Sequence, residues 1–456
     1  MILWANSIKA QRSRIGTLPF QQFLKSFASD SRLGFNYDAA FQGEIQKRKD
    51  TSTYRVLSNI NHVINHQGPK AYTNDHRKVI DVWCSNDYLG MRMNNEISSA
   101  IHSFVDRYGV SSTGSRNIAG HNQVFVDLEN SLANLHRKEA CLVFNSGYVA
   151  NDTTLATLAQ KLPGCVFFSD ELNHASMIQG IRNGKAAKVI FKHNDIQDLE
   201  EKLSRYPQKT PKVIAFESIY SMNGDIAPIE SICRLAKQYG ALTYLDEVHA
   251  VGMYGERGAG VTAALNISDQ VDVITGSLAK SYSATGGYAA GSSAFVDFIR
   301  SFCPGFIYTS SLPPHDIAAA LTSVEYLKSS DKERALQKSA VRKLKDALSD
   351  SGIPFLSNQS HIVPIMVGHP EYGRLISRDL IKDYNIYLHH INYPTVAKGT
   401  ERLRVTPTPL HNDEAILKHF ISALKELWKK YDLHGIDHWK ANGFSVNDPC
   451  HFPLVA

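Results

Sequence analysis

Apolar and polar positions alternate along the central part of this chain in two different rhythms. Short apolar runs that end at small or polar residues are typical of buried strands, and the stretches between them have the spacing of amphipathic helices. We predict strands over Ala140–Phe144, Val166–Ser169, Lys188–Lys192, Lys212–Glu217, Ala241–Asp246 and Val271–Thr275. We predict helices over Val124–Arg137, Val149–Gln160, His174–Asn183, Ile196–Arg205 and Ile229–Tyr239. This alternation indicates an α/β fold with a mainly parallel sheet that is covered on both faces.

The segments on either side have other patterns. Before the alternation we predict a strand over Val79–Trp83 and a helix over Glu96–Tyr108, and residues 54–64 have a weak helical period. After it we predict long helices over Asp316–Lys328 and Lys332–Leu348, then short strands over His361–Val367, Ile386–His389 and Arg402–Val405. The chain is therefore predicted to have a large domain over 96–330 and a smaller C-terminal α+β domain over 331–435. Residues 35–95 form an N-terminal segment that contributes to the substrate site, and residues 436–456 form an extension without periodicity.

Residues 1–34 have the composition of an organellar presequence. No acidic residue precedes Asp30, whereas basic residues, serines and spaced apolar residues are frequent. A secretory signal is not indicated because no continuous apolar stretch follows the first charges. We predict a mitochondrial matrix protein, with a family-specific N-terminal arm on a bacterial cytoplasmic protein as the alternative.

Composition narrows the class of protein further. The net charge of +5 over 456 residues is small, and no basic stripe predicts a nucleic-acid partner. No apolar run has the length of a membrane span, so we predict no integral membrane segment. Six scattered cysteines without metal-ligand spacing favour a reducing compartment and no metal site. A globular protein of two or three domains is the expected class.

Small or polar residues stand at or just after the ends of five of the predicted strands, namely Asn145, Asp170, Ser218, Asp246 and Gly276. Because the carboxyl ends of parallel strands meet at one edge of the sheet, we expect these residues to line one cleft. Lys280 follows the last of these strands. It is a candidate for a Schiff base with a carbonyl cofactor whose ring Asp246 would tune. An ion-paired surface lysine and a helix-capping aspartate are the alternative interpretation.

Three other stretches contain candidate ligand-binding residues. The turn Ser146-Gly147-Tyr148 lies between a strand and a helix, which predicts a phosphate site at the helix N-terminus. The loop from Gly109 to Arg116 is rich in small hydroxyl residues and suits either an acyl or carboxylate group or a tight turn. Arg402 and Arg404 are expected to face opposite sides of their strand, with one reaching the cleft and the other solvated or paired.

Eight motifs, in the same order along the chain, resemble those of the α-oxoamine synthases, which are pyridoxal-phosphate enzymes of the fold-type I aminotransferase class. They are WCSNDYLGM (83–91), SRNIAGHN (115–122), FSDELNHASMIQGI (168–181), FESIYSMNGDIAPI (216–229), LDEVHAVGMYGERGAG (245–260), GSLAKSYSATGGYAAGS (276–292), GFIYTSSLPP (305–314) and INYPTVAKGTERLRVTPTP (391–409). The last motif is similar to the branch that forms 5-aminolevulinate. The resemblance covers about residues 35 to 431 and implies an aminotransferase-like large domain with a smaller C-terminal domain.

The resemblance implies roles for four catalytic residues. Lys280 would form the Schiff base with pyridoxal 5'-phosphate and later remove a proton from bound glycine. Asp246 would pair with the pyridine nitrogen, His249 would bind the phenolic oxygen, and His174 would stack on the ring. The other cofactor-binding residues implied are Ser146, Gly147, Tyr148, Ser221 and Ser277, together with Thr309 and Ser310 from a second subunit of a homodimer whose active sites lie at the interface.

The resemblance also implies two substrates, glycine and succinyl-CoA, and the products 5-aminolevulinate, CoA and carbon dioxide. Arg404 would bind the glycine carboxylate. The residues implied for the acyl-CoA are Arg55, Asn86 and Ser115 at its succinyl end and Ser169, Lys188 and Thr395 elsewhere.

Ser115 stands where this branch usually has threonine, so the acyl pocket lacks a methyl group and relaxed acyl-chain selectivity is expected. The alternatives are another α-oxoamine synthase with a different acyl-CoA, such as a glycine C-acetyltransferase, or a non-catalytic partner subunit. Such a subunit would be expected to lack the Schiff-base lysine.

Overall fold

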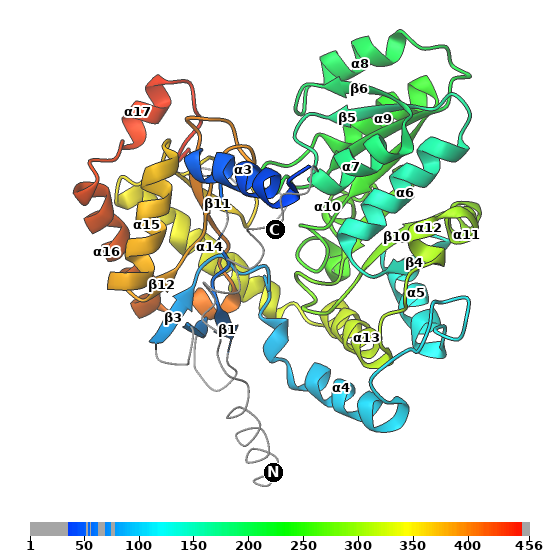
Figure 1. The fold of residues 1–456 in the computed structure, drawn as a ribbon, viewed down its shortest axis with the longest axis horizontal. Coiled ribbons are helices and arrows are strands. Elements are labelled where there is room, and N and C mark those ends of the chain that lie inside the picture. The colour runs from blue at the N-terminus through cyan, green and yellow to red at the C-terminus, as the bar shows by residue number, and fades with distance from the viewer. Residues whose placement is uncertain (1–34, 52, 55, 63–68, 74–77, 449–456) are drawn as a thin grey trace. The chain divides into compact units, whose positions relative to one another are not determined.

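The computed structural model describes residues 35–448 except 52, 55, 63–68 and 74–77 (Figure 1). The chain divides into two compact units at Val56. The first unit contains the helix α3 (Tyr37–Asp50), which begins where the side chain of Asn36 accepts a hydrogen bond from the N–H of Ala39 at 3.0 Å. None of the residues of α3 is buried. The apolar pattern did not predict this helix because its sides are almost uniformly polar.

The largest sheet of the second unit has seven strands (Figure 1). The strand order is β4-β10-β9-β8-β7-β5-β6. The bounds are β4 (Ala140–Phe144), β5 (Val166–Asp170), β6 (Ala187–Phe191), β7 (Lys212–Glu217), β8 (Ala241–Asp246), β9 (Val273–Ser277) and β10 (Gly287–Gly291). Strands β5 to β9 pair in parallel with one another. The predicted α/β fold with a mainly parallel sheet is therefore confirmed.

Strand β10 was not predicted, and it runs antiparallel between β4 and β9. Apart from Tyr288, its sequence GYAAG consists of glycine and alanine, which are depleted in strands and do not form the apolar run that marks a buried strand. The small residues are needed because the chain is crowded there. A Cβ atom on Gly287 would lie 2.2 Å from the backbone nitrogen of Gly147.

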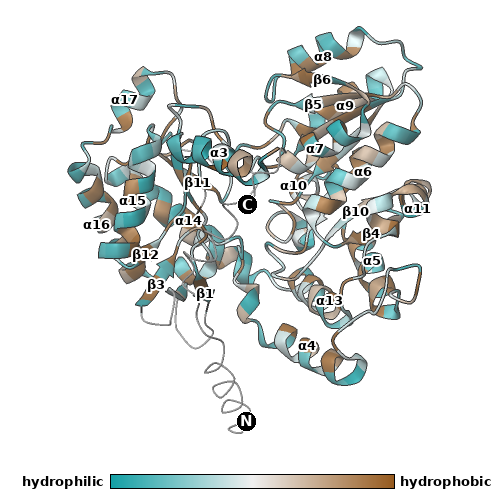
Figure 2. Cartoon of the chain, viewed as in Figure 1, coloured by the Kyte–Doolittle hydropathy of each residue, from teal (hydrophilic) through white to brown (hydrophobic). Residues whose placement is uncertain are grey.

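Helices cover both faces of this sheet. They are α5 (Gln123–Leu135), α6 (Gly147–Lys161), α7 (Ala175–Gly184), α8 (Ile196–Ser204), α9 (Ile229–Tyr239), α10 (Val261–Ala264), α11 (Ser293–Phe302) and α12 (Pro304–Ile307), with α4 (Asn95–Tyr108) and α13 (Pro314–Ser329) packed on each other. Each face of the sheet packs against its own hydrophobic cluster. In β7, for example, Val213 belongs to one cluster and the next residue, Ile214, belongs to the other. This is the period of two that a sheet buried on both faces requires. The helices carry both hydrophilic and hydrophobic positions, as amphipathic helices do (Figure 2).

Two smaller sheets contain strands from the C-terminal part of the chain. Strands β11 (Val363–Met366), β14 (Arg402–Val405) and β13 (His390–Ile391) form one of them, with α14 (Lys332–Asp350), α15 (Pro370–Asp383) and α16 (Glu414–Lys430) in the same part of the chain. The second sheet has the order β1 (Ile60–His62), β2 (Lys70–Thr73), β3 (Lys78–Val82) and β12 (Ile386–Tyr387). The predicted helical character of residues 54–64 is therefore wrong. Trp83 joins the same core as the C-terminal helices, with its ring 4.0 Å from that of Phe420.

The segment after Leu433 was expected to be an irregular appendage, and this expectation is wrong. It forms the helix α17 (Ile436–Ala441), in which Trp439 is buried. Val446 is also buried and pairs with Leu356 beside β11. The segment is held by a few buried residues, so a periodic pattern could not reveal it. The proposed domain boundaries themselves stay predictions.

In the described part of the chain, no helix combines the length and the apolar character needed to cross a membrane.

Helices α15 and α16 are joined through one buried carboxylate. Asp379 accepts hydrogen bonds from the Lys430 ammonium at 2.6 Å, from the hydroxyl of Tyr431, and from the Arg378 guanidinium at 2.9 Å. Burial opposes ionisation, but these three donors outweigh it and lower the pKa of Asp379. The carboxylate of Asp379 therefore stabilises the fold at every pH at which it is ionised.

We expect Asp379→Asn to lower the free energy of unfolding by about 1.5–3 kcal/mol, because charge-assisted hydrogen bonds are lost. Urea unfolding at pH 7 measures this difference. A folded-state pKa below the unfolded value means that the difference shrinks as the pH falls below about 4. Asp383→Asn, on the exposed side of the same helix, is the control. Equal effects of the two substitutions would contradict the assignment.

Candidate active site

The side chain of Lys280 lies beyond the end of β9, next to the end of β8. Its amine is 2.8 Å from Nε2 of His249. The surrounding protein removes this amine from water. That desolvation, followed by the positive charge of Arg404, lowers the pKa of Lys280 to about 7, although Asp246 and Glu217 act in the opposite direction. A substantial fraction of the amine is therefore neutral near pH 7, which is the form that reacts with aldehydes.

A hydrogen-bonded chain leads from Lys280 across to β14. Nδ1 of His249 lies 2.8 Å from the hydroxyl of Tyr88, which also accepts a hydrogen bond from Arg404 at 3.1 Å. The hydroxyl of Tyr88 is 3.2 Å from the side-chain oxygen of Asn86. Burial, then the charges of Lys280 and Arg404, lower the pKa of His249, so its imidazole is neutral. Tyr88 was not a predicted site residue. The feature of the sequence that could have identified Tyr88 is its position in the polar loop after β3.

Asp246 ends β8 and is held by a buried amide. Its Oδ2 accepts a hydrogen bond from Nδ2 of Asn151 at 2.6 Å, and its Oδ1 accepts one from the N–H of Val248 at 2.8 Å. The amide oxygen of Asn151 accepts from the hydroxyls of Tyr244 at 3.0 Å and Thr275 at 2.9 Å. These partners determine which way the Asn151 amide points. Asn151 lies in the middle of α6, so the sequence did not distinguish it from an ordinary helix residue.

His174 is connected to Asp246 through the same amide. Nδ1 of His174 is 2.7 Å from the hydroxyl of Ser176, which accepts a hydrogen bond from Asn151 at 3.2 Å. The backbone N–H of His174 donates to the buried carboxyl of Glu217 at 2.6 Å. These contacts place the imidazole at the start of α7, near the residues that follow β8 and β9.

A phosphate-sized group would fit best at the first turn of α6. Ser146 caps this helix by accepting a hydrogen bond from the N–H of Val149 at 3.1 Å. The first N–H groups of a helix have no partner within the helix, and its dipole favours an anion. A Cβ atom on Gly147 would come within 3.1 Å of Cβ of Ser277, so the helix start and the end of β9 approach closely. Tyr148 follows in the same turn, partly exposed.

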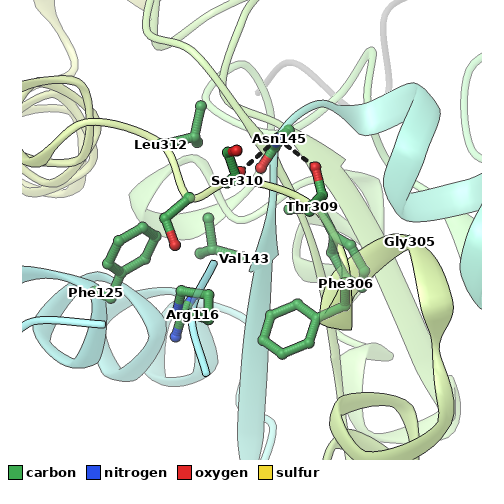
Figure 3. Close-up of a pocket in the computed structure, with 11 residues that line it drawn as sticks. Arg116, Phe125, Val143, Asn145, Gly305, Phe306, Thr309, Ser310 and Leu312 are labelled. Carbon is green, nitrogen blue, oxygen red and sulfur yellow. Dashed lines mark hydrogen bonds between the residues drawn. The ribbon is translucent and has the colours of Figure 1, made fainter. Parts of the chain in front are cut away.

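Thr309 and Ser310 lie beside Asn145 at the end of β4. The amide of Asn145 donates to Oγ1 of Thr309 at 3.2 Å and to the carbonyl of Ser310 at 3.0 Å (Figure 3). Ser115 pairs with Ser310 through a backbone bridge. The loop that carries Ser115 is therefore connected to the segment predicted to act in the other subunit.

The pocket beside these residues is lined by Arg116 and aromatic rings (Figure 3). Arg116 donates to both carboxylate oxygens of Glu129 at 3.0 Å and lies 4.0 Å from the centre of the Phe125 ring. Both of these hydrogen bonds come from the single nitrogen Nη2, and Nε of Arg116 donates to Nδ1 of His121 at 3.1 Å. These contacts hold the loop that carries Arg116 in place.

Arg404 and Arg402 both reach the turn after β7. Nε of Arg404 donates to the carbonyl of Ser221 at 2.7 Å, and Nη1 of Arg402 donates to the side chain of Asn223 at 2.8 Å. The prediction that the two arginines face opposite sides is wrong, because residues two apart on a strand share a face.

The remaining predicted residues lie elsewhere. Ser169 is buried in β5 and accepts a hydrogen bond from Asn173 at 2.9 Å. Lys188 is exposed on the edge strand β6, and Thr395 is exposed in the loop before β14. Arg55 lies outside the described residues. The structure thus brings Lys280, His249, Asn86, Arg404 and Ser221 into one group, to which Ser169, Lys188 and Thr395 are not hydrogen-bonded in the part of the chain that the structure describes.

These residues fit pyridoxal phosphate. The cofactor needs an amine for its aldehyde, a carboxylate for its ring nitrogen and donors for its phosphate. Lys280 and Asp246 lie at the ends of neighbouring strands, and the first turn of α6 with Ser277 supplies the donors. In the described ranges no cluster of side chains has the composition of a metal site.

Comparison with known proteins also gives the class of pyridoxal-phosphate enzymes. The family of class I and II aminotransferases matches residues 78–424, so the chain has the aminotransferase fold of that family. The mitochondrial 5-aminolevulinate synthase of Schizosaccharomyces pombe is 52% identical, over 99% of this chain and 83% of that protein. The enzyme of the same name from Yarrowia lipolytica is 49% identical, over 90% of this chain and 75% of that protein. The chain belongs to the 5-aminolevulinate synthase family.

Solved structures confirm the fold. A structure of SPT with PLP superposes with a TM-score of 0.81 at 28% identity, over 87% of this chain and 100% of that chain. The 8-amino-7-oxononanoate synthase of Francisella tularensis has a TM-score of 0.65 over 77% of this chain and 98% of that one, at 21% identity, which shows a likeness of fold alone.

We expect Asn151→Asp to weaken the binding of pyridoxal phosphate by about ten- to a hundredfold, because the substitution removes the charge-assisted hydrogen bond to Asp246 and places a second carboxylate beside it. Absorbance titration of the cofactor-free protein measures the dissociation constant. Thr153→Ala is the matched control, since Thr153 lies on the same helix and bonds only to the carbonyl of Val149. An unchanged cofactor affinity in Asn151→Asp would show that Asn151 does not hold Asp246.

Proposed function

We propose that this chain condenses glycine with succinyl-CoA and releases carbon dioxide, giving 5-aminolevulinate and CoA, the first step of haem synthesis. The observation that carries this proposal is the hydrogen-bonded chain from the amine of Lys280 through His249 and Tyr88 to Arg404. It connects a reactive amine with a carboxylate-binding group, in a family whose relatives are named for this reaction.

Pyridoxal phosphate is the cofactor, and when bound it supplies an aldehyde and a ring that stabilises negative charge on the substrate carbon. Lys280 holds the cofactor through its amine. With glycine bound, a free Lys280 amine would lie where it could remove a proton from the glycine carbon. Because its pKa is about 7, the amine can both accept and return that proton near neutral pH.

Asp246 would pair with the ring nitrogen, and His249 would donate toward the phenolic oxygen. His174 would lie against the ring face. Four groups hold the phosphate, namely the N–H groups of Gly147 and Tyr148 and the hydroxyls of Ser146 and Ser277. These roles are supported by the hydrogen bonds that already orient Asp246, His249 and His174.

Arg404 binds the glycine carboxylate. Its Nε is anchored on the carbonyl of Ser221, so its two terminal nitrogens are directed toward Asn86 and Tyr88. A carboxylate there would receive two parallel hydrogen bonds. Asn86 also adjoins the acyl side, where we assign Arg55 and Ser115 to the succinyl group and Ser169, Lys188 and Thr395 to the rest of the acyl-CoA. As CoA leaves, the bond from the succinyl carbonyl to glycine replaces the thioester bond.

We infer a homodimer in which Thr309 and Ser310 complete the phosphate site of the other subunit. Tyr308, directly before them, is 83% exposed in the single chain, which supports a partner surface there. We assign the protein to the mitochondrial matrix because its relatives are named mitochondrial enzymes. A non-catalytic partner subunit is not favoured, since Lys280, Asp246 and His249 are all present.

We expect succinyl-CoA to give the highest kcat/KM among succinyl-, acetyl- and longer acyl-CoA substrates with glycine. Ser115→Thr, which adds one methyl group to the acyl pocket, is expected to lower kcat/KM for longer acyl chains by about tenfold relative to succinyl-CoA. A product assay for the aminoketone, with Lys280→Ala as the inactive control, measures both. Preference for acetyl-CoA or a long-chain acyl-CoA would indicate another α-oxoamine synthase. Absence of product with every acyl-CoA would favour the non-catalytic subunit.

A further inference from the structure

A small hairpin follows β7 and carries Ser221 at its tip. Ile219 and Ile226 pair as an antiparallel bridge, and the N–H of Tyr220 donates to the carbonyl of Asp225 at 3.1 Å. The turn is closed by a hydrogen bond from the N–H of Gly224 to the carbonyl of Tyr220 at 2.8 Å. We call residues 219–226 the β7 hairpin.

The C-terminal part of the chain holds one side of the β7 hairpin. Arg404 donates to the carbonyl of Ser221, Arg402 donates to the side chain of Asn223, and Asn358 donates to the carbonyl of Asn223 at 2.8 Å. Gly224 has a φ of 77°, and a Cβ atom on it would lie 2.7 Å from the side chain of Asn358. The position of this hairpin therefore determines where the guanidinium of Arg404 is anchored.

His193 holds the other side of the β7 hairpin. Its Nδ1 lies 2.9 Å from Oδ1 of Asp170, and its Nε2 contacts Oδ2 of Asp225. Asp170 is buried at the end of β5, where it also accepts hydrogen bonds from the N–H groups of Leu172 at 2.9 Å and Asn194 at 3.0 Å. The imidazole thus joins the rigid end of a central strand to the hairpin.

Both ring nitrogens of His193 face carboxylate oxygens, which only accept hydrogen bonds when ionised. The imidazole satisfies both by carrying two protons and a positive charge. Burial acts against this charge, but the hydrogen bonds and charges of Asp170 and Asp225 raise the pKa of His193 to about 10. The edge of the His193 ring also packs at right angles to the Tyr220 ring, 4.4 Å between centres.

We propose that His193 is a positioning residue for the amino-acid substrate, because it fixes the β7 hairpin on which Arg404 is anchored. This inference rests on the proposed function, in which Arg404 binds the glycine carboxylate. Without the imidazolium, the carboxylates of Asp170 and Asp225 lose the cation between them, and the hairpin loses its bond to β5. Arg404 then loses its fixed partner at Ser221, and the acyl-CoA side of the site keeps its own contacts.

The test compares the two Michaelis constants in the holoenzyme. We expect His193→Ala to raise the KM for glycine by about tenfold, and to weaken glycine binding equally in absorbance titrations, while the KM for succinyl-CoA changes by less than about twofold. Lys202→Ala is the control. Lys202 lies in α8, the helix that follows His193 in the chain, and forms an ion pair with Asp198. Its other hydrogen bond is to the carbonyl of Ile190 and not to the β7 hairpin, so both Michaelis constants should stay unchanged.

Asp225→Asn provides a second, milder variant in case His193→Ala does not fold. It keeps an oxygen for His193 and removes only the charge, so the KM for glycine should rise about threefold. Unchanged glycine binding in either folded variant, or equal changes in both Michaelis constants, would overturn the inference. If the unmodified protein forms no 5-aminolevulinate, the proposed function fails instead, and the variants then show by glycine titration alone whether His193 acts on Arg404.

Discussion

The active site depends on one unfavourable placement, a lysine amine removed from water beside a cation. A buried ammonium is costly, and the charge of Arg404 nearby adds to the cost, so Lys280 tends to lose its proton. The carboxylates of Asp246 and Glu217 moderate this effect without cancelling it. The same arrangement keeps His249 neutral. A site with a neutral amine, a neutral imidazole and one fixed guanidinium can bind a carboxylate while leaving the amine free to react.

The surrounding fold makes this placement possible through close contacts between backbones. Strand β10 runs beside β9, and Gly287 meets the start of α6 at a distance that excludes any side chain. The helix start is thereby held against Ser277. Asn151, one turn further along α6, reaches Asp246. One helix therefore sets both the phosphate end and the ring-nitrogen end of the proposed cofactor site.

Much of this architecture could be predicted from the sequence. The apolar runs predicted β7 and β8 with their observed bounds and led to Lys280 and Asp246 at strand ends, and the resemblance assigned the glycine carboxylate to Arg404. The rest was hidden for physical reasons. Strand β10 is glycine and alanine apart from Tyr288, α3 has no apolar side, and the segment that contains α17 is held by a few buried residues such as Trp439 and Val446. Tyr88, Asn151 and His193 act through partners that are distant in sequence, so only the folded chain shows what they contact. The shared face of Arg402 and Arg404 was misjudged, although the period of a strand was sufficient to establish it.

The protonation of Lys280 tests the account most directly. The cofactor-free protein can be labelled briefly with an amine-selective reagent across a range of pH, and the labelled fraction at Lys280 followed by peptide mass spectrometry. The account predicts a midpoint near pH 7, in line with the pKa of about 7 that burial and Arg404 impose on this amine. A midpoint near the ordinary lysine value of about 10.4 would contradict it, because the amine would then be charged at neutral pH.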